Sequence, residues 1–585
     1  MSAAVQAEAA AVQRLLNAYL RETGIALDPV RSTSAAPDPQ AMTVALPRTR
    51  AWLAVLPTSL SPTGHHRFSP SWWSSFGDGW QPVTGTRVID LLVSEVAAAD
   101  GDEDRRTARR ERLLSQISDS VARTTYFLTA ELSGRVRPPV PGSADAFIAA
   151  EQALRTGHPF HPTPKSAQGL DGGDVERFAP ELGVAFRLHW LAVDPELAAT
   201  VTIDESADLP PLESVRPEAL ARLGGRRDEW PLLPVHPWQA AHLARLPQVE
   251  CLLQEGRLVV LGPLGPIVRP TSSVRTVWDA SSQCFLKLPF AVRVTNFVRV
   301  NPPEQLARSL HASAVLARLL PHLSLDRLTV LLERGYRGVR PRTLDHEAAQ
   351  DLLAHTAVVV RDGPDLSRGS PMVVAALLEP SACSGVTPLD RALRSAAAAA
   401  ARDPAAVVDT WLRRYLDVSL VPLLRLLAEG GVALEAHTQN SLVTFEDGWP
   451  AHLHARDLEG ASVDRSHPLA AQGYGGVLRP DSPALYETDD VWRRFAYYVV
   501  VNQVSDVVAG LARSSGVEEA RLWAEVRECL LTVAPQLPGD GCRRVEALVS
   551  GPHLPAKANL LSRFAERSED PLYVAIPNPL RTCVE

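Results

Sequence analysis

Long hydrophobic runs are missing from this sequence: no window approaches the roughly 18 uninterrupted apolar residues of a membrane-spanning helix. Long runs of one charge are also missing, and a net charge of −8 gives neither a basic surface for nucleic acid nor a polybasic membrane patch. Residues 1–24 carry acids among apolar positions at helical spacing, unlike a secretory signal. We therefore expect a surface helix here, in a cytoplasmic protein without nucleic-acid or membrane partners.

The six cysteines are scattered, and none forms a CxxC pair. Zinc and iron–sulfur centres need clustered cysteines, and disulfide frameworks are typical of short secreted chains. The sequence therefore argues against all three.

Lysine is nearly absent, because only three of the 59 Lys and Arg residues are lysine: Lys165, Lys287 and Lys557. A coding bias explains arginine wherever the surface tolerates it. Arginine offers a planar fork, whereas lysine is a compact point charge that fits a tight pocket around a phosphate or carboxylate oxygen. Each lysine is therefore either a chance survivor with its stem along apolar surface or a ligand of such an anion.

The length indicates roughly two to four domains with large cores. A proline-rich stretch, RVRPPVPGSADAF, and an alanine-rich stretch, RALRSAAAAAARDP, mark boundaries that divide the chain into 1–140, 141–403 and 404–585. The third region begins with an apolar helix, TWLRRYLDVSLVPLLRLLAEGG, which we expect to end at its glycine pair. Further helices are expected from about residue 489.

Residues 157–170, GHPFHPTPKSAQGL, hold His158, His161 and Lys165 in a loop that its prolines keep out of a regular helix. Two histidines three residues apart can bind a metal, but no third ligand is obvious nearby. Ordinary loop hydrogen bonds and a site for an anionic substrate remain as alternatives.

In residues 269–300 the main pattern is the alternation of side chains between the two faces of a strand. If FLKLPFAVRVTNFVRV is one strand, its even-numbered side chains form an apolar face. The odd-numbered positions then include a row of cations and hydroxyls, and the strand has no acid on this face: Ser273, Arg275, Lys287, Arg293, Thr295 and Arg299. A solvated strand face would mix charge signs, so the lack of acids predicts an anionic ligand such as a polyphosphate or polycarboxylate.

A hairpin is predicted within residues 432–460, with its turn at the DG pair 447–448. Parity places one set of polar residues on a common face, and the return strand ends in a second set: Glu435, His437 and Gln439, then Arg456, Asp457 and Glu459. Carboxylate and amide oxygens gathered in this way resemble a magnesium–nucleotide site. A polar hairpin face is the alternative.

Neither a GxxxxGK[ST] loop nor a GxGxxG motif after a strand is present, which excludes a P-loop and a Rossmann site. Two classes stay open: an enzyme that uses Mg-ATP on a carboxylate, and a non-catalytic polyanion-binding protein. A kinase-like ATP phosphotransferase is a further alternative, because a histidine, an asparagine and a later Asp followed by Gly echo a kinase site, although Gln439 stands where the catalytic Asp is expected.

Together these motifs resemble the IucA/IucC family of siderophore synthetases, which act independently of nonribosomal peptide synthetases. The resemblance covers about residues 140–580 and rests on HPxHPxxK (158–165), PxHPWQ (234–239), TSSxRT (271–276), KLPxxxxxTN (287–296) with Arg299, EAHxQN (435–440), RDLEG (456–460), KxxLxxR (557–563) and NPL (578–580). It implies an α+β cupped-hand architecture and a homodimer. The N-terminal region would be the thumb, the middle region the fingers, and the C-terminal region a FhuF-like palm that is distantly kinase-like.

The resemblance also implies the reaction. Family members activate a carboxylate of citrate or a related acid with Mg-ATP as an acyl-adenylate, and then condense it with an amine or alcohol. The expected cofactors are therefore ATP and Mg²⁺. By position, the catalytic residues are Arg275, Lys287, Arg299 and His437; the ATP contacts are Ser273, Arg275, Lys287, Thr295, Arg299, His437, Gln439 and Asp457; the Mg²⁺ ligands are Asp457 and Glu435; and the carboxylic acid lies toward His158, His161 and Lys165.

One departure from the family pattern concerns the acid. The family loop usually continues K-x-R-x-G, whereas Ala167 takes the arginine position here, and we hypothesise an acid smaller or less charged than citrate. The palm is also related to ferric-siderophore reductases, but these rely on clustered cysteines, and Cys529, Cys542 and Cys583 lack that spacing.

Overall fold

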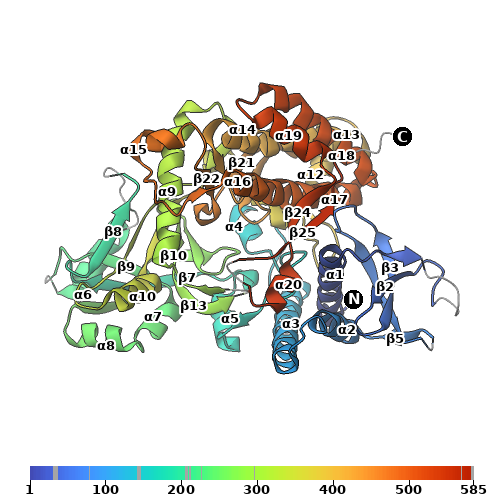
Figure 1. Cartoon of the computed structure of the whole chain (residues 1–585). Helices are drawn as coiled ribbons and strands as arrows, with labels where there is room; N and C mark the ends of the chain where they lie inside the picture. Colours follow the sequence, from blue (N-terminus) through green and yellow to red (C-terminus); the bar gives the residue numbers. More distant parts are fainter. Residues whose placement is uncertain are drawn as a thin grey trace.

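The computed structural model describes residues 1–29, 37–77, 79–140, 146–204, 209, 212–224, 227–294, 297–567 and 570–581. Its elements form three groups in Figure 1. The N-terminal helices and a small sheet lie at the right, a larger sheet lies at the left, and C-terminal helices cover the top.

The N-terminal group is a five-stranded antiparallel sheet, ordered β1-β2-β3-β4-β5, packed on three helices. α1 begins after Ser2, which caps the Val5 N–H, and ends at Gly24, whose φ of 70° suits glycine. The expected surface helix is wrong in one respect, because Leu16 and Tyr19 are fully buried where α1 packs on α2 and α3. The elements are α1 (Ala3–Thr23), β1 (Asp28–Pro29), β2 (Met42–Leu46), β3 (Ala51–Ser59), β4 (Arg67–Ser75), β5 (Gln81–Val83), α2 (Gly85–Ala97) and α3 (Glu103–Leu132).

The middle group contains an eight-stranded antiparallel sheet, ordered β8-β16-β17-β12-β11-β10-β7-β9. Apolar side chains such as Trp190, Val277 and Leu286 are buried in its core. Its strands are β7 (Phe186–Val193), β8 (Ala198–Thr202), β9 (Leu232–Val235), β10 (Leu258–Pro270), β11 (Thr276–Asp279), β12 (Cys284–Lys287), β16 (Glu333–Val339) and β17 (Val358–Asp362). The helices of this region are α4 (Ala146–Glu151), α5 (Gly172–Phe178), α6 (Leu212–Leu223), α7 (Pro237–Leu243), α8 (Pro247–Gln254), α9 (Pro303–Leu319) and α10 (His346–Thr356).

The C-terminal group packs helices on two small sheets and a hairpin around the largest apolar core. The sheets are β15-β21-β20-β18 and β19-β22-β23, and the hairpin is β24-β25. The strands are β15 (Leu328–Val330), β18 (Met372–Val373), β19 (Val432–Ala433), β20 (Ser441–Glu446), β21 (Trp449–Ala455), β22 (Ser462–Asp464), β23 (Leu485–Tyr486), β24 (His553–Lys557) and β25 (Tyr573–Pro577). The helices are α11 (Val374–Leu377), α12 (Pro388–Ala399), α13 (Pro404–Val418), α14 (Leu420–Gly430), α15 (Gly473–Gly476), α16 (Thr488–Phe495), α17 (Ser505–Ser515), α18 (Glu519–Val533), α19 (Gly541–Ser550) and α20 (Asn559–Phe564).

One continuous helical segment, Thr488–Ser515, is long and apolar enough to cross a membrane, but 83% of its most apolar window is buried inside the protein. It is therefore packed as a helix of the protein core. Its middle, Ala496–Val504, is a π-helix. Such wide turns are rare and frequently occur at functional sites.

The C-terminal region also returns to the N-terminal core. Leu560 and Phe564 of α20 are buried among the side chains of α1, α2 and α3, and Figure 1 shows α20 beside α3. The carboxylate of Glu22, near the end of α1, accepts the N–H groups of Leu560 and Leu561 at 2.9 and 2.8 Å. The two ends of the chain are therefore packed together.

The segment FLKLPFAVRVTNFVRV is not one strand, and this prediction is wrong. β12 ends at Lys287, and β13 (Phe290–Val294) and β14 (Phe297–Arg299) belong to a separate sheet, ordered β14-β13-β6, with β6 at Ala167–Gln168. Pro289 explains the break, because proline has no N–H for a ladder hydrogen bond. Parity therefore cannot be carried from Lys287 to Arg299, and Thr295 lies outside the described residues.

Two further expectations need correction in the palm region. The apolar helix is two helices, α13 and α14, which meet at Ser419. Residues 434–440, expected as a strand, form a loop before β20. Other predictions are confirmed: α14 ends at Gly431 (φ 69°), the turn between β20 and β21 has positive φ at Asp447 and Gly448, and α16 begins at Thr488.

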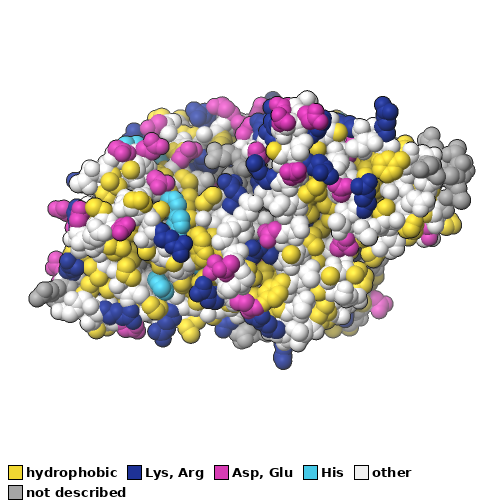
Figure 2. Space-filling model, turned by 90° about the horizontal axis from the view of Figure 1, so that it is seen from below, with side chains coloured by type: hydrophobic (Ala, Val, Ile, Leu, Met, Phe, Trp, Pro, Cys, Tyr) yellow, Lys and Arg dark blue, Asp and Glu magenta, His cyan; other side chains and the backbone are white. Residues whose placement is uncertain are grey.

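Basic and acidic side chains are interspersed on the face seen in Figure 2, without a large region of one sign. This distribution agrees with the absence of long charge runs in the sequence.

Candidate active site

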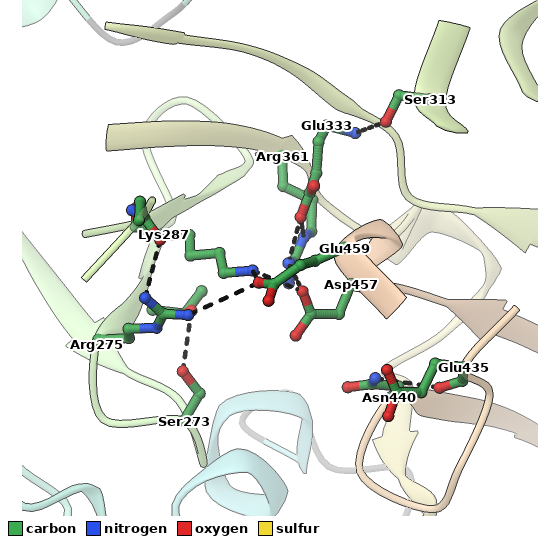
Figure 3. Close-up of polar contacts among 12 residues, drawn as sticks. Ser273, Arg275, Lys287, Ser313, Glu333, Arg361, Glu435, Asn440, Asp457 and Glu459 are labelled. Carbon is green, nitrogen blue, oxygen red and sulfur yellow. Dashed lines mark hydrogen bonds and ion pairs between the residues drawn. The ribbon is translucent and has the colours of Figure 1, made fainter. Parts of the chain in front are cut away.

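Three charged side chains from the middle sheet meet the turn that follows β21. Antiparallel pairing of β12 with β17 sets Phe285 opposite Arg361 and Lys287 opposite Val359, so Lys287 and Arg361 share one face of the sheet. Glu333 of β16 is opposite Arg361. The turn that follows β21 brings acids to the same point, as Figure 3 shows.

Lys287 is buried and binds two carboxylates from this turn. Its Nζ lies 2.8 Å from Asp457 Oδ1 and 2.8 Å from Glu459 Oε2. Burial alone would lower the pKa of Lys287, but the two carboxylates outweigh this effect and raise it above its ordinary value. Lys287 therefore remains a cation at the centre of the cluster.

Arg361 is a second buried cation of the cluster that sequence reasoning missed. Its Nη2 lies 2.6 Å from Glu333 Oε1 and 2.9 Å from Asp457 Oδ1. Burial would raise the pKa of Asp457, but Lys287 and Arg361 hold it well below its usual range. A signal was present in the sequence, because Arg361 ends the otherwise apolar run AVVV (357–360).

Arg275 is held by the backbone that leads to α9. Its Nη1 donates to the Val300 carbonyl at 2.7 Å and to Asn301 Oδ1 at 2.9 Å, and its Nη2 lies 4.0 Å from Glu459. The Asn301 amide in turn donates to the Lys287 carbonyl at 3.1 Å. Asn301, which the sequence analysis did not select, therefore positions both predicted cations.

The two remaining predicted nucleotide residues of the middle region lie beside this cluster. Ser273 Oγ donates to Thr276 Oγ1 at 3.0 Å in the turn before β11. Arg299 ends β14, and burial and the neighbouring Arg275 lower its pKa to about 10, although Glu459 and Asp457 oppose the shift. The structure thus brings Ser273, Arg275, Lys287, Arg299 and Asp457 together, although not through one strand.

The loop of residues 434–440 supplies the part of the site that comes from the C-terminal group. His437 Nδ1 accepts the N–H groups of Gln439 and Asn440 at 3.2 and 3.3 Å. Burial lowers the pKa of His437, although Glu435 opposes the shift. The neutral ring therefore carries its proton on Nε2, which lies 3.9 Å from Glu435 Oε1.

A buried network that the sequence analysis missed joins the two halves of the site. Arg456 donates to both carboxylate oxygens of Glu151 at 2.6 and 3.1 Å and to the Gln439 carbonyl at 2.9 Å. Glu151 also accepts the Ser272 N–H and hydroxyl at 3.3 and 3.2 Å, and the Gln439 amide reaches Ser272 Oγ at 3.3 Å. Glu151 thereby connects the turn at Ser272 to the loop of residues 434–440.

The loop of residues 157–170, which contains His158, approaches the loop of residues 434–440 through the π-helix. Asn502 Nδ2 lies 3.0 Å from His158 Nε2, and Asn502 Oδ1 accepts the Thr438 N–H at 3.4 Å. Burial lowers the pKa of His158 well below its ordinary value, so the ring is neutral. Asn502 therefore brings the predicted substrate loop next to His437.

Other residues of this loop are fixed by neighbouring elements. His161 Nδ1 accepts the Thr163 N–H at 3.2 Å. Lys165 Nζ lies 2.6 Å from Glu181, so a carboxylate of the protein already balances its charge. At Ala167, where the family usually has arginine, Arg123 of α3 donates to the Ala167 carbonyl at 3.0 Å. A guanidinium therefore reaches this loop from another element.

The third lysine also lies at the site. Lys557 Nζ lies 2.7 Å from the Tyr498 hydroxyl of the π-helix and 4.7 Å from the centre of its ring. The Tyr498 ring is 6.0 Å from the ring of His437. All three lysines therefore hold defined polar partners.

The side chains of the site offer few ligands for a metal ion. Within the described ranges, no group of three or more His, Cys, Asp and Glu side chains suits a metal ion. Mg²⁺ rarely uses an all-protein cage, and it binds through one or two carboxylates with substrate phosphates and water. The partly exposed carboxylates of Asp457 and Glu435 fit this role. A Cβ at Gly460 would lie 1.6 Å from Glu435 Oε2, so glycine here leaves the space that Glu435 occupies.

Comparisons with known proteins agree with this geometry. The IucA / IucC family profile matches residues 146–379, and the profile of the ferric iron reductase FhuF-like transporter family matches residues 409–572. The chain is 32% identical to the L-2,3-diaminopropanoate–citrate ligase of Staphylococcus aureus, over 98% of this chain and 96% of that protein. It is 30% identical to the rhizobactin siderophore biosynthesis protein RhbC of Rhizobium meliloti, over 89% of each.

The fold matches a solved structure over nearly its whole length. ATP-bound aerobactin synthetase IucA from a hypervirulent pathotype of Klebsiella pneumoniae superposes with a TM-score of 0.82 at 24% identity, covering 98% of this chain and 99% of that one. The predicted α+β architecture of the siderophore synthetases is confirmed.

Proposed function

The chain belongs to the IucA/IucC family, and from this premise we propose that it is an ATP-dependent siderophore synthetase. It adenylates a carboxylate of citrate or a related polycarboxylic acid and condenses the product with an amine or alcohol. The observation that carries the proposal is the buried cluster in which Arg275, Lys287 and Arg361 surround Asp457 and Glu459. Such a density of cations inside a protein suits a polyphosphate.

The proposed chemistry has two steps. A carboxylate oxygen attacks the α-phosphorus of ATP, and pyrophosphate leaves. The amine nitrogen then attacks the acyl carbon, and AMP leaves. Lys287, Arg275 and Arg299 stabilise the negative charge that grows on the phosphates in the first step. His437 offers an Nε2–H to an oxygen of the nucleotide, and Ser273 and Gln439 orient it, so catalysis consists of positioning and charge stabilisation.

Mg²⁺ is proposed to bind at Asp457 and Glu435 together with the phosphates. Its chemistry is to neutralise phosphate charge and polarise the α-phosphate. Lys287 and Arg361 lower the pKa of Asp457, which favours the ionised carboxylate that a cation would bind.

Citrate is the acid that we propose first. The Staphylococcus aureus relative is named as a citrate ligase, and L-2,3-diaminopropanoate is its other named substrate. His158 and His161 lie on the proposed acid side of the site, while Glu181 balances the charge of Lys165. The Arg123 guanidinium that reaches this loop is bound to Asp119 and to the Ala167 carbonyl, so a smaller acid stays the alternative to citrate.

The proposals on domains, oligomeric state and cellular location follow from the family. We propose a thumb over 1–140, fingers over 141–403 and a palm over 404–585, and a homodimer that acts in the cytoplasm on small molecules. The contact of α20 with the N-terminal core supports a thumb that closes on the palm.

The proposal is tested by trapping the activated acid with hydroxylamine in the presence of Mg-ATP. The panel contains citrate, citryl amides, 2-oxoglutarate and succinyl derivatives, and we expect hydroxamate and pyrophosphate with citrate or a citryl amide. L-2,3-diaminopropanoate in place of hydroxylamine should then give the amide and AMP. Formation of ADP without hydroxamate would favour the kinase alternative, and nucleotide binding without turnover would favour a polyanion-binding protein.

A further inference from the structure

Glu459 contacts the two cations that the proposed nucleotide needs. Its Oε2 lies 2.8 Å from Lys287 Nζ and 4.0 Å from Arg275 Nη2. A carboxylate between two phosphate-binding cations takes the place of a phosphate oxygen. Figure 3 shows the Glu459 carboxylate beside the Lys287 amine and the Asp457 carboxylate.

The charges of the cluster nearly balance without a nucleotide. The cations are Arg275, Lys287, Arg299 and Arg361, and the carboxylates are Glu333, Asp457 and Glu459. The cations therefore exceed the acids by one. ATP without a metal would bring about four negative charges to this buried space, whereas its Mg²⁺ complex brings about two, and uncompensated buried charge is costly.

Glu459 differs from Asp457 in how firmly it is held. Asp457 bonds to both Lys287 and Arg361, and its backbone has a positive φ of 69°, which fixes the carboxylate close to the turn. Glu459 follows in a short 3₁₀ turn, Leu458–Gly460, anchored by buried Leu458. Its longer side chain is able to leave Lys287 by rotation about its own bonds while the backbone stays in place.

We propose that Glu459 is a removable counter-ion that holds Lys287 and Arg275 until a metal-complexed polyphosphate arrives, so that the site selects nucleotide with a divalent cation over free nucleotide. This proposal rests on the proposed function. When the complex binds, the phosphates take Lys287 and Arg275, and the positive charge that accompanies them compensates Glu459. Free ATP offers no such compensation and must displace Glu459 against the charge of its own phosphates.

Replacing Glu459 by glutamine tests this selection. ATP and pyrophosphate binding are measured by calorimetry, once with EDTA and once with Mg²⁺. The Glu459→Gln protein should bind metal-free ATP and pyrophosphate at least tenfold more tightly than wild type, and the ratio of Mg²⁺ to metal-free affinity should fall by a similar factor. Glu459→Asp keeps the charge and should keep most of the wild-type ratio.

Glu196→Gln is the matched control, because it removes the same charge from an exposed side chain whose partner is Arg257 and not a residue of the cluster. It should bind metal-free ATP as wild type does. A metal-free affinity of Glu459→Gln equal to that of wild type, with wild type binding Mg-ATP and activating citrate, would overturn the counter-ion proposal alone. Failure of wild type to bind Mg-ATP would overturn the proposed function with it. A melting curve of each variant confirms that the folded protein is compared.

Discussion

Replacing Lys287 by arginine is expected to lower the adenylation rate about 100-fold, the usual cost of losing one preorganised donor to a transition state. Lys287 is buried and places a single Nζ within 2.8 Å of both Asp457 and Glu459. The wider guanidinium fork cannot occupy this position without moving Arg361, which already bonds to Asp457. The loss is measured as acid-dependent pyrophosphate exchange under saturating ATP.

A matched control separates this effect from a general effect of the substitution. Arg479→Lys exchanges the same two residue types in the opposite sense at an exposed ion pair with Asp481, and it should retain wild-type exchange. Exchange by Lys287→Arg close to the wild-type rate would contradict the proposed phosphate contact, and Lys287 would then be a lysine retained by chance.

The second large effect is expected from Glu151→Ala, which should destabilise the protein by about 3–5 kcal/mol. Arg456 and Glu151 are both buried, and removal of the carboxylate leaves the Arg456 guanidinium without a counter-ion. The same change frees the Ser272 turn, so ATP binding should weaken as well. Urea unfolding with and without Mg-ATP measures both effects.

The double variant Glu151→Ala with Arg456→Met is the control for this interpretation. It removes both charges, so it should recover part of the stability that the single variant loses. A single variant within about 0.5 kcal/mol of wild type, where surface substitutions usually fall, would show that the pair does not join the two halves of the site.

The sequence predicted the residues of the site more accurately than the strands that carry them. Parity selected Ser273, Arg275, Lys287, Arg293, Thr295 and Arg299. Four of these residues meet, whereas Arg293 is exposed on β13 and Thr295 lies outside the described residues. The four meet because β11 and β12 are paired and because the chain turns at Pro289, not because one strand carries them all. The hairpin pattern selected His437, Gln439 and Asp457, although residues 434–440 form a loop and not a strand. The resemblance to the family supplied their role as nucleotide contacts.

Residues missed by the sequence analysis have partners that are distant in the chain. Arg361 binds Asp457 across 96 positions, and Glu151 binds Arg456, which the hairpin pattern had selected, across 305. Local periodicity carries no information on such pairings, which depend on strand order in the eight-stranded sheet and on how the palm packs against it. Sequence reasoning did not select Asn301 either, since its amide bonds to backbone carbonyls.

The lysine content of the chain has a physical explanation. Lys165 lies 2.6 Å from Glu181, Lys287 binds two carboxylates, and Lys557 donates to Tyr498. Each is at least half-buried, with a defined partner at its Nζ. The lysines that remain in this arginine-rich protein are therefore those for which a point charge on a thin stem fits and a planar fork does not.

The most direct test of the account follows an oxygen atom. Citrate labelled with ¹⁸O in its carboxylates is incubated with the protein, Mg-ATP and an amine acceptor, and the nucleotide and phosphate products are analysed by mass spectrometry. Attack of the carboxylate on the α-phosphorus predicts one ¹⁸O atom in AMP and none in pyrophosphate. Label in inorganic phosphate together with ADP, or unlabelled AMP, would contradict an acyl-adenylate.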